Sequence, residues 1–180
     1  MVSDQATPIS VSELKTHLDK DLNLSSSDVQ VFDVAPSDPY LLVSATKLVE
    51  IMKYLRDQSS LEFNFLQVVS ATDFVAVEAS DEKPAVKERV EILYVVYSFA
   101  RKMYLNVKVE LPRNNAEVDT LSHLFRAANW YERECFDLLG VNFKNHPYLE
   151  RLLLPPDWVG HPLKKDYKFP EEYNGMKVPL

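Results

Sequence analysis

The chain has 180 residues and a formal net charge of −7, with 46% hydrophobic and 26% charged side chains. This composition is typical of a globular protein with a core of its own, and no apolar run approaches the roughly 18 residues that span a bilayer. The acidic balance argues against nucleic-acid binding, which needs clustered Lys and Arg.

Cysteine and glycine are scarce, which excludes several cofactor sites. Cys135 is the only cysteine, so the chain alone cannot supply the four thiolates of an iron–sulfur cluster. No glycine precedes Gly140, so neither a GxGxxG turn nor a P-loop can lie before it. The N-terminus lacks the basic and apolar regions of a signal peptide, which makes a cytoplasmic location the expectation.

A helix and two short strands are predicted first. Ser10 and Glu13 have the spacing of a capping box, and the helix that they begin should end near Asp21. Alternating side chains predict a strand over 29–34, followed by a proline-containing turn and a second strand over 40–43.

The second helix is predicted from a capping residue and an apolar stripe. Ser44 is placed to cap it, and the residue spacing is that of one helix face. The stripe consists of Leu48, Ile51, Met52 and Leu55. The apolar run 61–69 that follows fits a helix or a strand, and we interpret it as a short helix.

Three strands then form an antiparallel meander, over 74–79, 89–99 and 103–110, with a charged loop at 80–88 between the first two. Apolar and polar residues alternate in the last strand, as in a half-solvated sheet. We therefore predict an α+β fold with two layers: a mostly antiparallel sheet, helices on one face, and an extended C-terminal tail.

A long helix is predicted over 118–139, opened by Asn114 or Asn115 and closed by Gly140. Its apolar stripe consists of Val118, Leu121, Phe125, Ala128, Tyr131, Cys135 and Leu138. A second face carries Arg126, Trp130, Arg133 and Asp137, and Glu132 and Glu134 lie beside it. We expect this charged face to be solvated or docked on another surface.

The chain after Gly140 has a different character. It holds the other two glycines and six of the eleven prolines, yet it is rich in leucine and aromatic residues. We therefore divide the protein into an α+β domain, 1–140, and an extended proline-rich docking tail, 141–180. The tail from His161 onward should act as a docking arm, because its prolines limit the entropy lost on binding and its lysines suit an acidic partner. These lysines are Lys164, Lys165 and Lys168.

The charge cluster on the long helix has a catalytic and a structural interpretation. Glu134 and Asp137 are three residues apart and could form a carboxylate pair for acid–base catalysis. The structural interpretation, which the spacing favours, pairs Arg133 with Asp137 and leaves the glutamates to solvent or a partner.

The sequence gives less support to a metal site built from histidines or to a cysteine nucleophile. His123, His146 and His161 have no recognised metal-binding spacing, and two of them precede proline. Cys135 lies within the apolar stripe, which favours a core thiol over a nucleophile.

The stretch 129–167 resembles the C subunit of the proton-pumping NADH:quinone oxidoreductase, respiratory complex I. The resemblance keeps its spacing along the whole stretch and begins with Asn129-Trp130-Tyr131-Glu132-Arg133-Glu134 and Asp137-Leu138-Leu139-Gly140-Val141. It continues through Phe143, His146-Pro147, Leu149, Arg151-Leu152-Leu153, Asp157-Trp158 and Gly160-His161-Pro162-Leu163-Lys164-Lys165-Asp166-Tyr167. Ser70–Phe74 and Pro112-Arg113 agree more loosely, and Glu150 and Lys164 depart from the usual residues.

This resemblance implies a structural subunit of the peripheral arm that carries no cofactor and no catalytic site. FMN and iron–sulfur clusters belong to partner subunits in that family, and the whole enzyme passes electrons from NADH to a quinone. The implied partners are the quinone-pocket subunit (the D subunit) and cluster-bearing neighbours, with no nucleic acid. The chain would lie on the cytoplasmic side of the membrane and associate with it only through the complex.

The resemblance also implies a partner interface. Its residues are Trp130, Glu132, Arg133, Glu134, Asp137, His146, Arg151, His161, Lys164, Lys165, Asp166 and Tyr167. Two alternatives stay open. One is the equivalent subunit of a related membrane-bound hydrogenase or another complex I-like enzyme, and the other is a free-standing hydrolase that uses Glu134 and Asp137.

Overall fold

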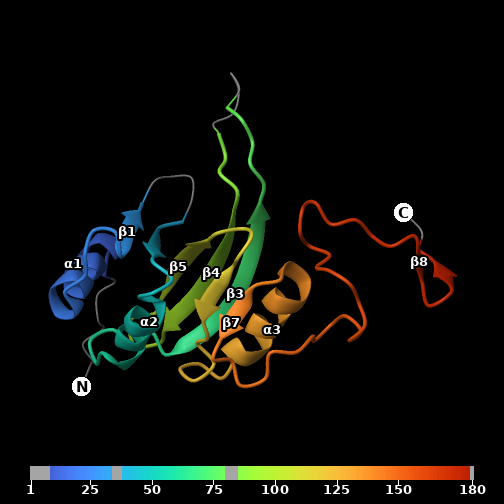
Figure 1. The fold of residues 1–180 in the computed structure, drawn as a ribbon. Coiled ribbons are helices and arrows are strands. Elements are labelled where there is room, and N and C mark those ends of the chain that lie inside the picture. Colours follow the sequence, from blue (N-terminus) through green and yellow to red (C-terminus); the bar gives the residue numbers. More distant parts are fainter. Residues whose placement is uncertain (1–8, 34–37, 80–84, 179–180) are drawn as a thin grey trace.

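The computed structural model describes residues 9–33, 38–79 and 85–178, and its centre is a five-stranded sheet with the order β1-β2-β5-β4-β3 (Figure 1). The strands are β1 (Val29–Phe32), β2 (Tyr40–Val43), β3 (Phe65–Phe74), β4 (Arg89–Ser98) and β5 (Met103–Leu111). Every neighbouring pair is antiparallel except β2 and β5, which are parallel. The predicted α+β class and the mostly antiparallel sheet are confirmed.

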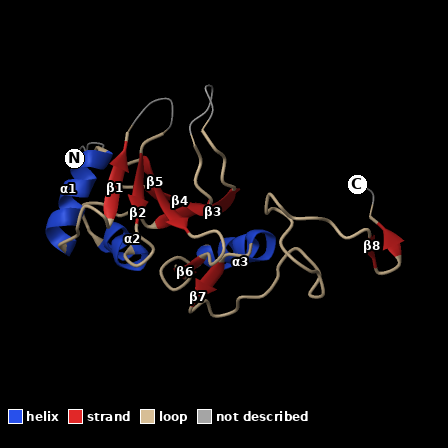
Figure 2. Ribbon diagram, turned by 45° about the horizontal axis from the view of Figure 1, so that its top comes forward, coloured by secondary structure: helices blue, strands red, loops and turns tan. Residues whose placement is uncertain are grey.

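In the described residues three helices accompany the sheet: α1 (Val11–Leu22), α2 (Leu48–Asp57) and α3 (Ala128–Leu139). Helices α2 and α3 lie on the same side of the sheet, and α1 lies beside β1 at one edge (Figures 1 and 2). The sheet side chains that face this layer alternate along the strands and are buried, and β4 contributes Val90, Ile92, Tyr94 and Val96. This is the two-layer arrangement that the sequence predicts.

Local signals explain most of the element boundaries. Ser10 and Glu13 form the predicted capping box at the start of α1. Gly140 ends α3 in the left-handed conformation, with a φ of +74°. The stripe of α2 is buried as predicted, but its N-cap is Lys47, and no side chain caps the helix. The Ser44 hydroxyl instead contacts Thr46 Oγ1.

The helix predicted over 61–69 is wrong. Strand β3 begins at Phe65 and pairs with β4 over its whole length, with a bulge between Leu66 and Val68. An apolar run has no decisive period of its own, so a long partner strand determines its conformation. The turn expected at 36–39 and the loop expected at 80–88 lie partly outside the described residues.

The long helix over 118–139 is also wrong in its first ten residues. Strand β6 (Glu117–Asp119) pairs in parallel with β7 (Asn142–Lys144), which places Val118 beside Phe143. The following turns bury Leu121 and Phe125 before α3 begins at Ala128. A spacing of three and four residues is therefore met here by a strand and two turns, because burial is what the pattern reports.

The tail contains one regular element after β7 in the described residues, a hairpin of β8 (Glu172–Tyr173) and β9 (Met176–Lys177). Asn174 and Gly175 occupy its turn with φ values of +50° and +79°. An Asn-Gly pair is a strong local hairpin signal because both residues tolerate positive φ, so this hairpin could have been predicted from the sequence. Figure 2 shows this hairpin at a distance from the sheet.

Candidate functional site

The buried carboxylate of Asp137 holds the start of the tail against α3. Its Oδ2 atom accepts hydrogen bonds from three successive backbone N–H groups, those of 152, 153 and 154, at 3.0, 2.7 and 2.9 Å. Its Oδ1 atom accepts from Arg151 Nη1 at 2.7 Å. Burial alone would raise the pKa of Asp137, but these donors outweigh it and hold the pKa below its ordinary value.

Arg151 extends this contact along the tail. Its guanidinium donates to the carbonyl oxygens of Asp137, Trp158 and Gly160 at 3.2, 2.9 and 3.0 Å. The His161 ring packs closely on Gly140: a Cβ atom added to Gly140 would lie only 2.7 Å from the Cδ2 atom of His161. One arginine therefore joins the end of α3 to two separate points of the tail.

A second buried carboxylate, that of Asp73 at the end of β3, holds the tail farther on. It accepts from Arg113 Nε at 2.6 Å and from the backbone N–H of Lys165 at 2.8 Å. Arg113 also reaches Asp166, at 2.6 Å from its Nη2 atom. The hydrogen bond from Arg113 is the main cause of a lowered pKa at Asp73. We call the four side chains Asp73, Arg113, Asp137 and Arg151 the tail anchor.

Arg133 does not pair with Asp137, which corrects our interpretation from spacing. It donates instead to the carbonyl oxygens of Glu150 and Arg151, both at 3.1 Å. Its guanidinium also lies 5.4 Å from the Trp130 ring centroid and 5.1 Å from that of Tyr148. Trp130 is 63% exposed and Tyr148 is 54% exposed. We call Trp130, Arg133 and Tyr148 the Arg133 shelf.

Glu132 faces the interior rather than solvent. Its carboxylate accepts from the Thr120 hydroxyl and from the backbone N–H of Leu121, the latter at 2.7 Å. The buried His146 ring lies 3.8 Å away, and its Nδ1 atom accepts from the backbone N–H of Tyr148. Burial raises the pKa of Glu132 to about 7 and lowers the pKa of His146.

The remaining candidates are the two possible catalytic groups of α3 and the residues that the tail exposes. Glu134 is exposed on α3, whereas Asp137 is committed to backbone donors, so the two do not form an open carboxylate pair. Cys135 is buried, and burial raises the pKa of its thiol to about 12, as for an unreactive core cysteine. The exposed groups are charged or apolar tail residues: Leu153, Val159, Leu163, Lys165, Asp166, Lys168 and Phe169.

The remaining interface candidates are partly buried in the tail. Lys164 is half-buried, and the Tyr167 hydroxyl donates to the carbonyl oxygen of Val159 at 3.0 Å. Asp73, Arg113 and Thr120 make contacts to which our sequence analysis gave no role. Asp73 could have been found from the sequence, because a charged residue near the end of a long apolar strand needs a partner when it is buried.

Two features are absent from the part of the chain that the structure describes: a group of side chains that could hold a metal ion, and a helix that could cross a membrane. Over residues 9–33, 38–79 and 85–178, no three His, Cys, Asp or Glu side chains are grouped so as to hold a metal ion. Within the same ranges, no helix has the length and apolarity that crossing a membrane requires.

Comparison with known proteins places this surface in a family. Residues 41–173 match the family model described as the respiratory-chain NADH dehydrogenase, 30 Kd subunit, so the match includes the whole tail anchor and the Arg133 shelf.

Curated relatives are named as the C subunit of NADH-quinone oxidoreductase. The protein of Geobacter metallireducens is 42% identical over 125 residues, which are 69% of this chain and 71% of that protein. The protein of Chlorobium phaeobacteroides is 34% identical over 153 residues, which are 84% and 86% of the two chains.

Two solved structures share the fold. The trypsin-resistant fragment of Nqo5 superimposes with a TM-score of 0.57 at 20% identity, over 76% of this chain and 98% of the fragment. A chain of the archaeal membrane-bound sulfane sulfur reductase gives 0.58 at 18% identity, over 81% of this chain and 76% of that one.

Proposed function

Because the chain belongs to the family of the respiratory-chain NADH dehydrogenase, 30 Kd subunit, we propose that it works as a docking subunit of that enzyme. Its Arg133 shelf and anchored tail bind the quinone-pocket subunit (the D subunit), next to cluster-bearing neighbours. The chain itself contributes no cofactor and no catalytic group. FMN and the iron–sulfur clusters are carried by partner subunits, which suits a chain with one cysteine that is buried.

The observation that carries this proposal is the use of buried charge to hold an irregular tail. Removing two carboxylates from water is costly, and the cost is offset only when each is fully hydrogen-bonded. Here tail donors contribute at both carboxylates: three backbone N–H groups at Asp137, and the N–H of Lys165 at Asp73, where Arg113 is the other donor. These contacts hold the tail in one conformation before any partner binds, which supports a role in docking.

The anchored tail displays apolar side chains outward. Leu153, Val159, Leu163 and Phe169 are all exposed, although the backbone beneath the first three is fixed. Fixing an exposed apolar segment before binding lowers the entropy that it loses on binding, which raises affinity. We propose that these side chains, with the basic Lys165 and Lys168, form one interface together with the Arg133 shelf.

The structure leads us to refine the proposed residues and boundaries. Glu132 and Asp137 have no exposed surface, so their role in the interface is indirect: they position the segments that touch the partner. The tail, 141–180, has an anchored part up to Tyr167 and an outer part that carries the hairpin. Our proposed location is the cytoplasmic side of the membrane, with association only through the complex.

Arg133→Ala should impair assembly far more than folding. The two carbonyl oxygens that lose their donor are near the surface, so the free energy of unfolding should fall by only about 1 kcal/mol. Arginine flanked by exposed aromatic rings is a frequent interface hot spot, and its loss should cost about 2 kcal/mol of binding, roughly 30-fold in affinity. Co-purification of the quinone-pocket subunit with the tagged variant measures this.

Two further variants control this experiment. Arg126→Ala removes an exposed charge one turn before the shelf and should assemble normally. Arg133→Lys keeps the charge but loses the planar, forked donor, so it should remain defective. Normal assembly of Arg133→Ala would show that the shelf is not part of the interface.

A further inference from the structure

The face of the sheet away from α2 and α3 is apolar at one end only; at the other end it is polar, where Lys108 of β5 pairs with Glu91 of β4 at 2.8 Å. Strand β4 has buried side chains on one face, and along its other face the charged Glu91 is followed by Leu93, Val95 and Tyr97. An antiparallel strand with one solvated face normally alternates apolar and polar residues. Over 93–97 both faces of this central strand are apolar, and an apolar surface of this kind favours a covering partner at this end of the outer face.

Aromatic rings gather at one end of this face. Tyr97 lies between Phe65 on β3 and Tyr104 on β5 in the strand pairing. Its ring centroid is 4.5 Å from that of Tyr104 and 4.9 Å from that of Phe99, which in turn contacts Phe65 edge-on at 5.7 Å. Phe99 and Tyr104 are 64% and 58% exposed. Contiguous exposed patches of large apolar side chains often mark interaction sites.

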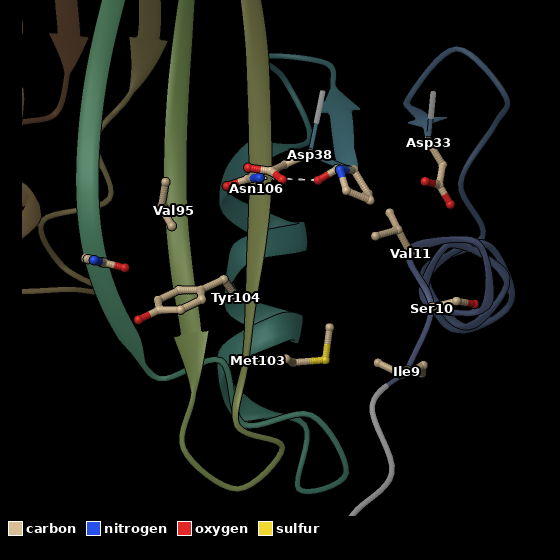
Figure 3. Close-up of a pocket in the computed structure, with 11 residues that line it drawn as sticks. Ile9, Ser10, Val11, Asp33, Asp38, Val95, Met103, Tyr104 and Asn106 are labelled. Carbon is tan, nitrogen blue, oxygen red and sulfur yellow. Dashed lines mark hydrogen bonds between the residues drawn. The ribbon is translucent and has the colours of Figure 1, made fainter. Parts of the chain in front are cut away.

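The same face borders a cavity of about 670 Å³ between the sheet and the first turn of α1. Figure 3 shows Val95 and Tyr104 on the sheet side and Ile9 and Val11 opposite them, with Met103 at one end. The cavity is large enough for several side chains of a partner segment.

The rim of this cavity is acidic. Figure 3 places Asp33 at the end of β1 and Asp38 before β2, both at the rim, and both are exposed. Neither forms an ion pair with any residue that the structure describes. The nearest strand lysine, Lys108, is instead held by Glu91 at 2.8 Å and by the Tyr40 ring. The rim is therefore free to attract a cation.

We propose that this groove, lined by Ile9, Val11, Val95, Met103 and Tyr104 and rimmed by Asp33 and Asp38, docks a second partner. The occupant is an amphipathic segment of another subunit of the same complex, which places apolar side chains in the groove and Lys or Arg at the rim. The location on the opposite face of the sheet from the Arg133 shelf makes this an interface separate from the tail. The inference rests on the proposed function only in placing the occupant within the complex.

Photo-crosslinking in the assembled complex tests this inference. With Tyr104→p-benzoylphenylalanine, we expect a crosslink to one segment of another subunit that has Lys or Arg beside apolar residues. The exposed position of Tyr104 makes the substitution compatible with folding. Adding Asp33→Lys and Asp38→Lys should lower the crosslink yield about 10-fold, because like charges then meet at the rim.

A second crosslinker position separates this inference from the proposed function. Phe169→p-benzoylphenylalanine reports on the tail and should crosslink to the quinone-pocket subunit whether or not the rim is reversed. A Tyr104 crosslink to residues 1–8 of the same chain, to a second copy, or to no protein while the Phe169 crosslink persists would overturn the second interface alone. Loss of only the Phe169 crosslink would contradict the proposed role of the tail.

Discussion

Asp137→Asn should destabilise the protein by about 3–5 kcal/mol and free the start of the tail from α3. The side chain accepts from Arg151 and from three backbone N–H groups at once, and it has no exposed surface. An amide has one acceptor atom and one donor group, so in either orientation a donor faces Arg151 or the backbone N–H groups. Breaking one partner of a buried charge pair has effects of this size.

Chemical denaturation with amide hydrogen exchange measures both consequences. We expect a lower midpoint and faster exchange at the amides of 152, 153 and 154. Asp157→Asn is the matched control, because this exposed carboxylate accepts one hydrogen bond from Tyr173, and its loss should cost less than about 1 kcal/mol. Unchanged stability and unchanged protection in Asp137→Asn would refute the anchor.

The largest pH effect is expected at Glu132, whose pKa burial raises from 4.5 to about 7. Between pH 4.5 and about pH 7, Glu132 therefore holds its proton in the folded state but loses it in the unfolded state. The free energy of unfolding should therefore fall as the pH rises through this window, by about 3 kcal/mol in total. Glu132→Gln keeps the shape of the protonated side chain and should remove this dependence.

The prediction is measured as the difference in unfolding free energy between Glu132→Gln and the parent from pH 4 to pH 8. His146 faces Glu132, and its lowered pKa gives the opposite slope, since its unfolded form binds the proton first as the pH falls. Taking the difference cancels the contribution of His146 where the ring environment is unchanged. We expect the variant to match the parent near pH 4 and to exceed it by about 3 kcal/mol at pH 8. Parallel curves would show that Glu132 titrates normally.

Patterns that depend on neighbouring residues predicted much of the fold. The capping box of α1, the stripe of α2 and the alternation in β5 each lie within one turn, one helix or one strand, and the structure confirms them. The region 61–74 and the start of α3 depended on distant partners. β3 is fixed by β4, and residues 120–121 are held by Glu132 of the helix that the sequence analysis began too early.

The tail anchor was beyond prediction for the same reason. Asp73 and Lys165 are 92 residues apart, and no local pattern connects them. The i, i+4 spacing predicted that Arg133 pairs with Asp137. The residue that pairs with it is Arg151, fourteen residues later in the chain, whose guanidinium reaches a carboxylate that already accepts from three N–H groups. The resemblance marked Asp137 and Arg151 as interface residues but gave no such role to the rest of the tail anchor. The structure separates residues that face outward from those that hold the tail in place.

The central claim, that the exposed surface of the tail docks the chain in its complex, is tested most directly by the double variant Leu153→Ser and Val159→Ser. This variant keeps the tail anchor and removes only two apolar side chains that the anchored tail exposes. We expect its melting temperature to stay within about 2 °C of the parent, since it keeps every contact of the tail anchor with the sheet and α3. Far less of the quinone-pocket subunit should co-purify with it. Co-purification equal to that of the parent would contradict the claim.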